Sequence, residues 1–156
     1  MAQRDGDGWI NCRCGSQHWG LHGAAGLLLV EAGKILLQHR APWVHSGDTW
    51  GIPGGARDSH ETPLEAALRE ANEEIGLNVD LVTQRGEHRD DHGDWRYDTI
   101  IATAPSHALL FEHNHETIDL RWFLIDEITE LTLHPSFAKS WPKVSALLLG
   151  IEGGAA

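Results

Sequence analysis

The chain has 156 residues, of which 41% are hydrophobic and 22% are charged, and this composition suits one globular domain with a sizeable core. The formal net charge of −11, with histidine neutral, argues against long nucleic acid as a partner, because that partner requires a basic face. No apolar run is long enough to span a bilayer, and the N-terminus lacks the pattern of a signal peptide. We therefore expect a cytoplasmic protein with no membrane partner.

Strand-like and helix-like segments intermix along the chain. Residues 1–20 are polar and glycine-rich and predict an irregular N-terminal arm, residues 21–150 predict a single domain, and residues 151–156 predict a frayed tail. Within the domain we expect strands at 21–30, 34–39, 50–53, 79–88, 96–104, 109–111 and 120–125, and helices at 62–75, 126–131 and 134–149, the last disturbed at Pro142. This order predicts an α/β or α+β sandwich.

The helix at 62–75 has clear start and stop signals. The order Thr62, Pro63 and Glu65 matches a capping box, in which Thr62 accepts from the Glu65 backbone and the Glu65 side chain reaches back. Gly76 suits the left-handed conformation that ends a helix. The bounds of this helix are therefore set by local sequence.

Two stripes run along that helix at about 100° per residue. The apolar stripe, which should face a core, contains Leu64, Ala67, Leu68, Ala71 and Ile75. The acidic stripe contains Glu70, Glu73 and Glu74, with Arg69 beside it. A solvated face with ion pairs is one interpretation, but the cluster keeps excess negative charge, and hard divalent cations prefer oxygen ligands of this kind. We therefore favour a metal site.

The stretch from Gly55 to Leu77 resembles a complete Nudix box, the motif of the MutT-like Nudix hydrolases. The resemblance is carried by Gly55, Glu61, Arg69, Glu70, Glu73, Glu74 and Gly76. The segments 50–55 and 122–128 also resemble the family, so that the likeness covers roughly residues 21–131.

This resemblance implies a fold and a reaction. The fold is an α/β/α sandwich with a mixed β-sheet. The enzyme is a nucleotide pyrophosphohydrolase acting on acid anhydrides, which cleaves the diphosphate linkage of a nucleoside diphosphate joined to another group. It uses Mg²⁺ or Mn²⁺ and a metal-activated water. The substrate is a small nucleotide, either a nucleoside triphosphate, oxidised or not, or a nucleotide sugar. Homodimers are common among similar proteins.

The resemblance also implies roles for individual residues. The metal ligands are the carbonyl of Gly54 and the carboxylates of Glu70, Glu73 and Glu74. Arg69 orients the glutamates, and Glu61 holds the loop onto the helix. The expected catalytic residues are Glu61, Arg69, Glu70 and Glu74. The general base is one of three candidates, Glu70, Glu74 or an acid from a loop outside the box.

A further metal ligand is expected from a loop ahead of the late strand, as in many similar proteins. Glu116 is the preferred residue, with Glu112 and Asp119 as weaker alternatives, and a plain surface acid is the other interpretation of Glu116.

Substrate-binding residues are expected in loops and at strand ends. Arg40 ends the second strand, at a position that contacts phosphate in some members of the similar family. Trp43, Trp50, Trp95 and Tyr97 could stack on a base, and Trp95 is favoured because it lies in a polar loop.

Two alternatives to this picture come from other residues and other classes of protein. One is a catalytically silent Nudix-fold module that binds nucleotide or regulates, which the intact acidic stripe disfavours. The other is a zinc site made by Cys12, Cys14, His18 and His22, which the tight Cys-x-Cys spacing and the lack of a second cysteine pair disfavour.

Overall fold

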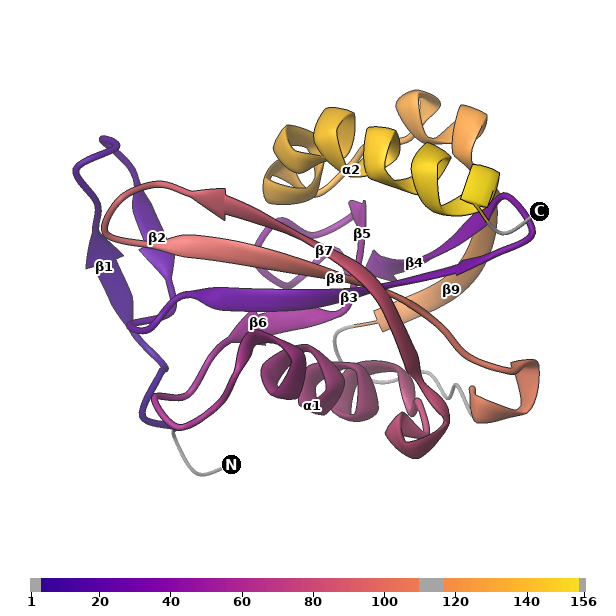
Figure 1. Cartoon of the computed structure of the whole chain (residues 1–156). Coiled ribbons are helices and arrows are strands. Elements are labelled where there is room, and N and C mark those ends of the chain that lie inside the picture. Colours follow the sequence, from indigo (N-terminus) through magenta and orange to yellow (C-terminus); the bar gives the residue numbers. More distant parts are fainter. Residues whose placement is uncertain (1–3, 110–116, 155–156) are drawn as a thin grey trace.

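A mixed sheet lies between two helices in the computed structural model, which describes residues 4–109 and 117–154 (Figure 1). The strands are β1 (Trp9–Asn11), β2 (Gln17–Trp19), β3 (Ala24–Glu31), β4 (Lys34–Arg40), β5 (Trp50–Gly51), β6 (Gly54–Ala56), β7 (Thr83–Asp91), β8 (Arg96–Thr103) and β9 (Thr117–Leu124). The α-helices are α1 (Pro63–Ile75) and α2 (Pro135–Gly154), and the 3₁₀ turns are η1 (Val79–Leu81), η2 (Ser106–Ala108) and η3 (Ile125–Glu130). The fold is the expected Nudix-type α/β arrangement, a mixed sheet flanked by helices.

Strand β3 connects the parts of the sheet. Within the described residues, the strand order is β5-β4-β3-β8-β7, with β6 added to β3 and β9 added to β4. β3 runs parallel to β8 and antiparallel to β6, which pairs with residues 24–26 of β3. The far end of β3 pairs with β4 instead. β6 is therefore anchored to the central strand just before the chain enters α1.

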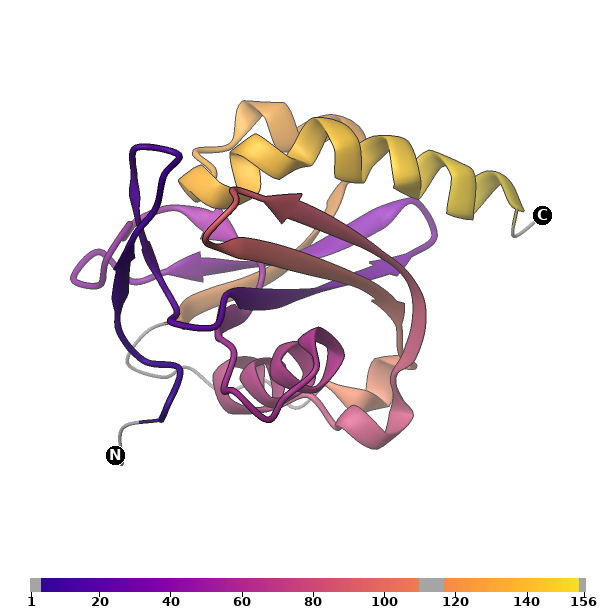
Figure 2. The same cartoon turned by 60° about the vertical axis from the view of Figure 1, so that its left-hand side comes forward.

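The core fills both faces of the sheet, which explains the nearly continuous apolar run in β3. Alternate residues of each central strand point to opposite helices. The cluster beneath α1 includes Leu27, Leu29, Ile100, Ala67, Ala71 and Ile75. The cluster beneath α2 includes Leu28, Val30, Ile101, Val144 and Leu148. Figure 2 shows the two helices on opposite sides of the strands.

Helix α1 begins and ends as its sequence predicts. The Thr62 hydroxyl accepts from the Glu65 backbone N–H at 3.1 Å, and Glu65 accepts from the Thr62 N–H at 2.9 Å. Gly76 has a φ of 65° and stops the helix. Ala67, Ala71 and Ile75 are buried as expected, whereas Leu64 and Leu68 are partly buried.

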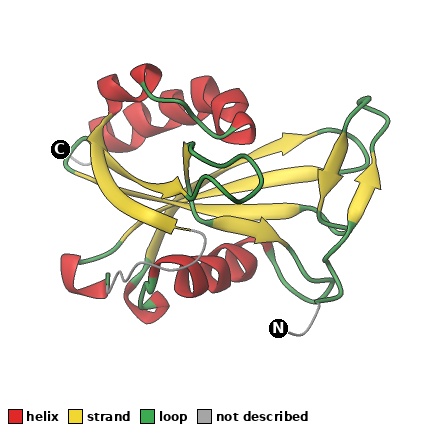
Figure 3. Ribbon diagram, turned by 180° about the vertical axis from the view of Figure 1, so that it is seen from behind, coloured by secondary structure: helices red, strands yellow, loops and turns green. Residues whose placement is uncertain are grey.

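The N-terminal arm is not irregular, contrary to the sequence prediction. Its strands β1 and β2 form an antiparallel hairpin that projects from one end of the molecule (Figure 3). Trp9 and Trp19 are paired across it, with ring centroids 5.3 Å apart. Short strands separated by glycine and polar residues carry little periodic signal, and the hairpin depends on packing of Cys12 against Ala24 and Trp95.

Other bounds also differ from the prediction. The segment expected as a strand at 79–88 begins with η1, since the Asn78 side chain accepts from the Asp80 N–H at 3.2 Å and caps this turn. The short helix expected at 126–131 is present as the 3₁₀ helix η3, which begins and ends one residue earlier. Of the strand expected at 109–111, the described part is Leu109, which bridges to Leu77, and residues 110–111 lie outside the described residues.

Helix α2 continues past the predicted end, so that residues 151–154 belong to it rather than to a frayed tail. Pro142 lies inside the helix. The helix persists because Val144, Leu148 and Ile151 follow one another along the face that packs on the sheet. Neither α2 nor any other helix of the described residues is long and apolar enough to cross a membrane.

Replacing Thr62 by alanine should destabilise the protein. The variant loses the hydroxyl that accepts from the Glu65 N–H, and we expect the free energy of unfolding to fall by about 1 kcal/mol in urea denaturation. The control is Thr132→Ala, an exposed threonine outside the helices and strands, which should change stability by less than about 0.5 kcal/mol. Equal losses in both variants would contradict a role for the cap.

Candidate active site

A cavity of about 450 Å³ opens between the β1–β2 hairpin, the β5–β6 segment and the start of α2. Its walls consist of aromatic and polar side chains and of the backbone of glycine residues. They include Trp9, His18, Trp19, Arg40, Ile52, Gly54, Gly55, Trp95, Tyr97, His134 and Phe137. Because Gly54 and Gly55 form part of the lining, the cavity adjoins the acidic face of α1.

The backbone of β6 lies directly against the glutamates of α1. The Gly54 N–H donates to Glu74 Oε2 at 2.8 Å, and Gln38 donates to Glu74 Oε1 at 3.4 Å. A Cβ atom added to Gly55 would lie 2.6 Å from Glu70 Oε1, so that any larger residue here would displace the Glu70 carboxylate. Glu74 is buried, although it belongs to the stripe that the sequence marks as acidic. Its side chain therefore faces β6 rather than bulk solvent.

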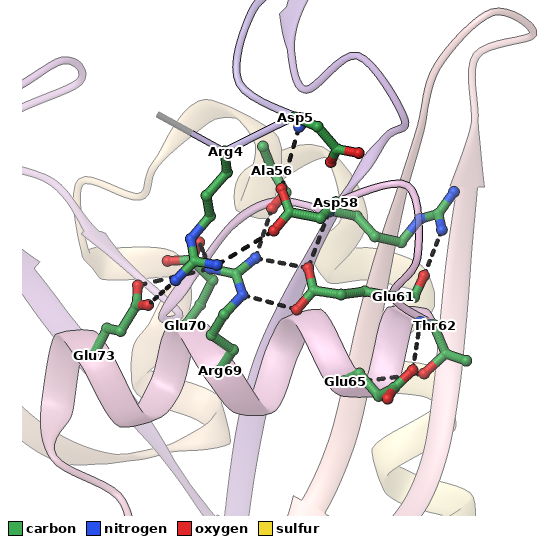
Figure 4. Close-up of polar contacts among 12 residues, drawn as sticks. Arg4, Asp5, Ala56, Asp58, Glu61, Thr62, Glu65, Arg69, Glu70 and Glu73 are labelled. Atoms are coloured by element: carbon green, nitrogen blue, oxygen red, sulfur yellow. Dashed lines mark hydrogen bonds and ion pairs between the residues drawn. The ribbon is translucent and has the colours of Figure 1, made fainter. Parts of the chain in front are cut away.

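Arg69 connects this helix to the preceding loop (Figure 4). Its Nε and Nη2 donate to the two carboxylate oxygens of Glu61, each at 2.8 Å, and Nη2 also donates to the Ala56 carbonyl at 3.0 Å. Nη1 donates to Glu70 Oε1 at 2.9 Å. These hydrogen bonds, with Glu61 first, raise the pKa of Arg69, and the Arg69 hydrogen bond lowers the pKa of Glu61. The pair is charged at neutral pH.

Arg4 adds a second cation to the acidic face. Its guanidinium donates to Glu73 at 2.8 Å and to the buried Asp58 at 3.3 Å. Asp58 also accepts from the Gly6 N–H at 3.1 Å, which ties the N-terminal segment to the loop before α1. Arg4 and Glu73 are 69 positions apart, and no sequence pattern indicated this contact.

Burial changes the acidity of two side chains beside the cavity. Burial, and then the charge of Glu73, raise the pKa of Glu70 against the opposing effect of Arg69. Burial, and then the charges of Glu74 and Glu70, raise the pKa of Tyr97, so its phenol is neutral. The Tyr97 hydroxyl lies at β6, where it would be 2.7 Å from a Cβ on Gly54. The oxygen atoms of Gly54, Glu70, Glu73 and Glu74 suit a hard divalent cation.

The structure brings some of the predicted substrate residues to the cavity and not others. Arg40 lines it and donates to the His45 carbonyl at 3.2 and 2.8 Å. Trp95 and Tyr97 also line it. Trp50 does not line it and instead stacks on His39 at 4.5 Å.

The remaining candidates for base stacking and for the further metal ligand do not line the cavity or lie outside the described residues. Trp43 is exposed and does not line the cavity. Asp119 lies on β9, where it accepts from Arg121 at 2.6 Å. Glu116 and Glu112 lie outside the described residues.

Sequence reasoning missed several lining residues that come from the two ends of the chain. Trp9 and Trp19 come from the hairpin, and His134 and Phe137 come from the start of α2. Burial, followed by the charge of Arg40, lowers the pKa of His134 to about 4, so that its imidazole is neutral at pH 7. Each hairpin strand has three residues, which is too short to give a periodic signal in the sequence.

The chain is similar in sequence to known proteins over most of its length. The family described as NUDIX domain matches residues 20–144. A Mycobacterium tuberculosis protein named "Putative 8-oxo-dGTP diphosphatase 3" is 44% identical over 155 residues, covering 92% of this chain and 71% of that protein. A nucleoside triphosphate pyrophosphatase/Nudix hydrolase fusion protein of Bifidobacterium longum is 40% identical, covering 94% of this chain and 32% of its own length.

The chain is also similar in structure to solved proteins. The Nudix hydrolase RenU from M. smegmatis has a TM-score of 0.79 and 43% identity, covering 92% of this chain and 97% of that one. An Ap4A hydrolase from C. elegans has a TM-score of 0.64 at 21% identity, covering 81% of this chain and 98% of its own, and shares the fold.

Fold, motif and relatives together define a pyrophosphohydrolase that acts on nucleotides. The chain belongs to the Nudix family and is a Nudix hydrolase.

Replacing Glu61 by glutamine should destabilise the protein at pH 7 by about 1–3 kcal/mol, because Arg69 loses a charged partner. The folded-state pKa of Glu61 is lowered, so its contribution is full above its unfolded pKa of about 4.3 and disappears as pH falls through the folded-state pKa. The difference in unfolding free energy between wild type and variant should therefore shrink in acid, as followed by urea denaturation at several pH values. Glu130→Gln, at an exposed glutamate, should show little difference at any pH, and a Glu61 effect that is constant with pH would refute the prediction.

Proposed function

We propose that the chain hydrolyses a purine nucleoside triphosphate to the nucleoside monophosphate and pyrophosphate, with Mg²⁺ or Mn²⁺, and that 8-oxo-dGTP is the first candidate substrate. The observation that carries the proposal is a cavity that joins an aromatic wall to the Gly54–Gly55 backbone, against which Glu70 and Glu74 of α1 lie. The name of the M. tuberculosis relative supports the choice of nucleotide.

The aromatic end of the cavity fits a base. Trp9 and Trp19 are 52% and 42% exposed, although they line the cavity, and therefore offer open ring surface. Trp95 is buried and stacks on His18 at 4.1 Å, so that it supports the wall rather than offering a free face. Base stacking on exposed aromatic rings is worth about 1–3 kcal/mol per base.

The other end fits a triphosphate with its cation. The residues suited to hold the cation are Gly54, Glu70, Glu73 and Glu74, because they supply oxygen ligands from β6 and from the face of α1 that lies against it, where the Gly54 N–H donates to Glu74 and Gly55 leaves room for the Glu70 carboxylate. A bound Mg²⁺ supplies positive charge to the phosphates and acidifies water. Arg40 lines the same cavity and supplies a further positive charge toward phosphate oxygens.

In the reaction, water forms a bond to one phosphorus atom of the anhydride between the α- and β-phosphates, the bond from that phosphorus to the bridging oxygen breaks, and the bridging oxygen leaves on the other product. A carboxylate takes the proton from the water, and Glu70 and Glu74 are both suited to this. Arg69 orients Glu70 through the 2.9 Å hydrogen bond, and Gly54 and Gln38 orient Glu74. Glu61 acts through Arg69, since it holds the guanidinium in place. Most of the catalysis then comes from positioning and electrostatics.

A nucleotide panel tests this function. The native chain with Mg²⁺ should hydrolyse 8-oxo-dGTP with the highest kcat/KM among 8-oxo-dGTP, dGTP, ATP, a nucleotide sugar and a diadenosine polyphosphate, with monophosphate and pyrophosphate as products. A preference for the nucleotide sugar would replace the proposed substrate. Failure to hydrolyse any of them would support a silent binding module instead.

Substitutions in the same assay test whether the acidic residues of α1 take part in the reaction. Glu73→Gln and Glu74→Gln should reduce kcat by at least about 100-fold with a circular dichroism spectrum like that of the wild type. The exposed Glu130→Gln should leave kcat unchanged. Full activity of both site variants would remove the acidic face from the mechanism.

Replacing Trp9 by alanine should weaken substrate binding. Loss of one stacking ring should raise KM roughly 5- to 150-fold, with a smaller effect on kcat, in steady-state kinetics. Trp43→Ala is the matched control, because Trp43 is 62% exposed but does not line the cavity. Equal KM changes for the two variants would argue against the hairpin as the base wall.

A further inference from the structure

The β1–β2 hairpin brings together three side-chain atoms that can bind a metal ion, two sulfurs and one imidazole nitrogen. The Sγ atoms of Cys12 and Cys14 and a ring nitrogen of His18 all lie within 4.8 Å of one another. Cys14 Sγ is 3.1 Å from His18 Nε2. Cys12 is buried, whereas Cys14 is exposed. The group stands apart from the glutamates of α1, because it is built on the hairpin.

The backbone at the turn of this hairpin is arranged around the sulfur of Cys12. The Cys14 N–H is 3.5 Å from Cys12 Sγ and points to it as a donor. The Gly15 N–H donates to the Cys12 carbonyl at 3.0 Å, and Gly15 has a φ of +94°, which closes a tight turn. An N–H group directed at sulfur favours the thiolate, which is the form that binds metal. The turn also overcomes the tight Cys-x-Cys spacing, since it folds Cys14 back toward Cys12.

We propose that Cys12, Cys14 and His18 bind a Zn²⁺ ion, with water as the fourth ligand. Tetrahedral zinc has Zn–S and Zn–N distances of about 2.3 and 2.0–2.1 Å, which place its ligand atoms roughly 3.5–3.8 Å apart. Cys14 Sγ and His18 Nε2 are 3.1 Å apart, slightly less than that range, and all three atoms lie within 4.8 Å of one another, so that side-chain rotations bring them to zinc-binding distances. The exposure of Cys14 gives water access to the fourth position.

The choice of metal follows from the ligands. Two thiolates and an imidazole suit zinc, whereas Mg²⁺ prefers the oxygen ligands of α1. His22, which the sequence also offered, is not part of this cluster in the described residues. Binding releases the thiol protons to solvent, including the one that Cys12 now directs to the His92 carbonyl at 3.2 Å.

The site would hold the hairpin against the cavity. The His18 ring stacks on Trp95 with an interplanar angle of 4°, and the Trp95 Nε1–H donates to the Trp19 carbonyl at 3.2 Å. A zinc ion on His18 therefore fixes the ring that backs the Trp95 wall and closes the hairpin between its two strands. Its role is structural, and it does not depend on which nucleotide the enzyme hydrolyses.

The test is a titration of the full, reduced chain with Cd²⁺ as a zinc substitute, in excess Mg²⁺ so that the carboxylates are occupied. We expect a thiolate-to-cadmium charge-transfer absorption in the ultraviolet that saturates at one equivalent and that Zn²⁺ removes by competition. The absence of this absorption in the wild-type protein would overturn the proposal, whatever the behaviour of any variant.

Variants then assign the ligands. Cys14→Ser should abolish the absorption, and His18→Gln should weaken the affinity for Cd²⁺ by at least about 10-fold, a size typical of a lost metal-site interaction. His22→Gln is the matched control and should titrate like the wild type. An unchanged titration in both Cys14→Ser and His18→Gln would show that cadmium binds elsewhere and would equally overturn the site.

Discussion

A loop and a helix that both carry carboxylates repel each other unless cations lie between them, and in this chain Arg69 is the first such cation and Arg4 the second. The Arg69 guanidinium binds both oxygens of Glu61 and the Ala56 carbonyl of the loop, and on the helix it binds Glu70. The planar guanidinium of Arg69 makes these contacts at the same time, and the ammonium group of a lysine could not reproduce this geometry. Together with the hydrogen bond from the Gly54 N–H to Glu74, this interaction holds β6 and the following loop against α1.

The acidic face is arranged for positive charge. Burial raises the pKa of Glu70, while Glu74 is held by the Gly54 backbone and Glu73 by Arg4. Like charges held this close and partly removed from water are costly for the folded state. A divalent cation together with a polyphosphate would offset that cost, which explains how a destabilising cluster serves a hydrolase. Arg4 reaches the same cluster from the N-terminal segment, so this segment contributes to the electrostatics of the site.

The two ends of the chain complete the cavity that the motif begins. The β1–β2 hairpin supplies Trp9 and Trp19, and the start of α2 supplies His134 and Phe137. His134 is kept neutral by burial beside Arg40, so that its imidazole adds no charge to the cavity. The motif therefore supplies the acidic face of α1 and the Gly55 approach, whereas much of the cavity wall comes from segments on either side of it.

The sequence by itself determined helix α1, its Thr62 and Gly76 ends, and the acidic stripe, because caps and helical period act within a few residues. It also determined the family, because the motif has fixed spacing. The hairpin, the contact of Arg4 with Glu73 and the burial of Glu74 were decided by the tertiary structure. Those features join residues tens of positions apart, and their energies depend on packing and desolvation that no local pattern encodes.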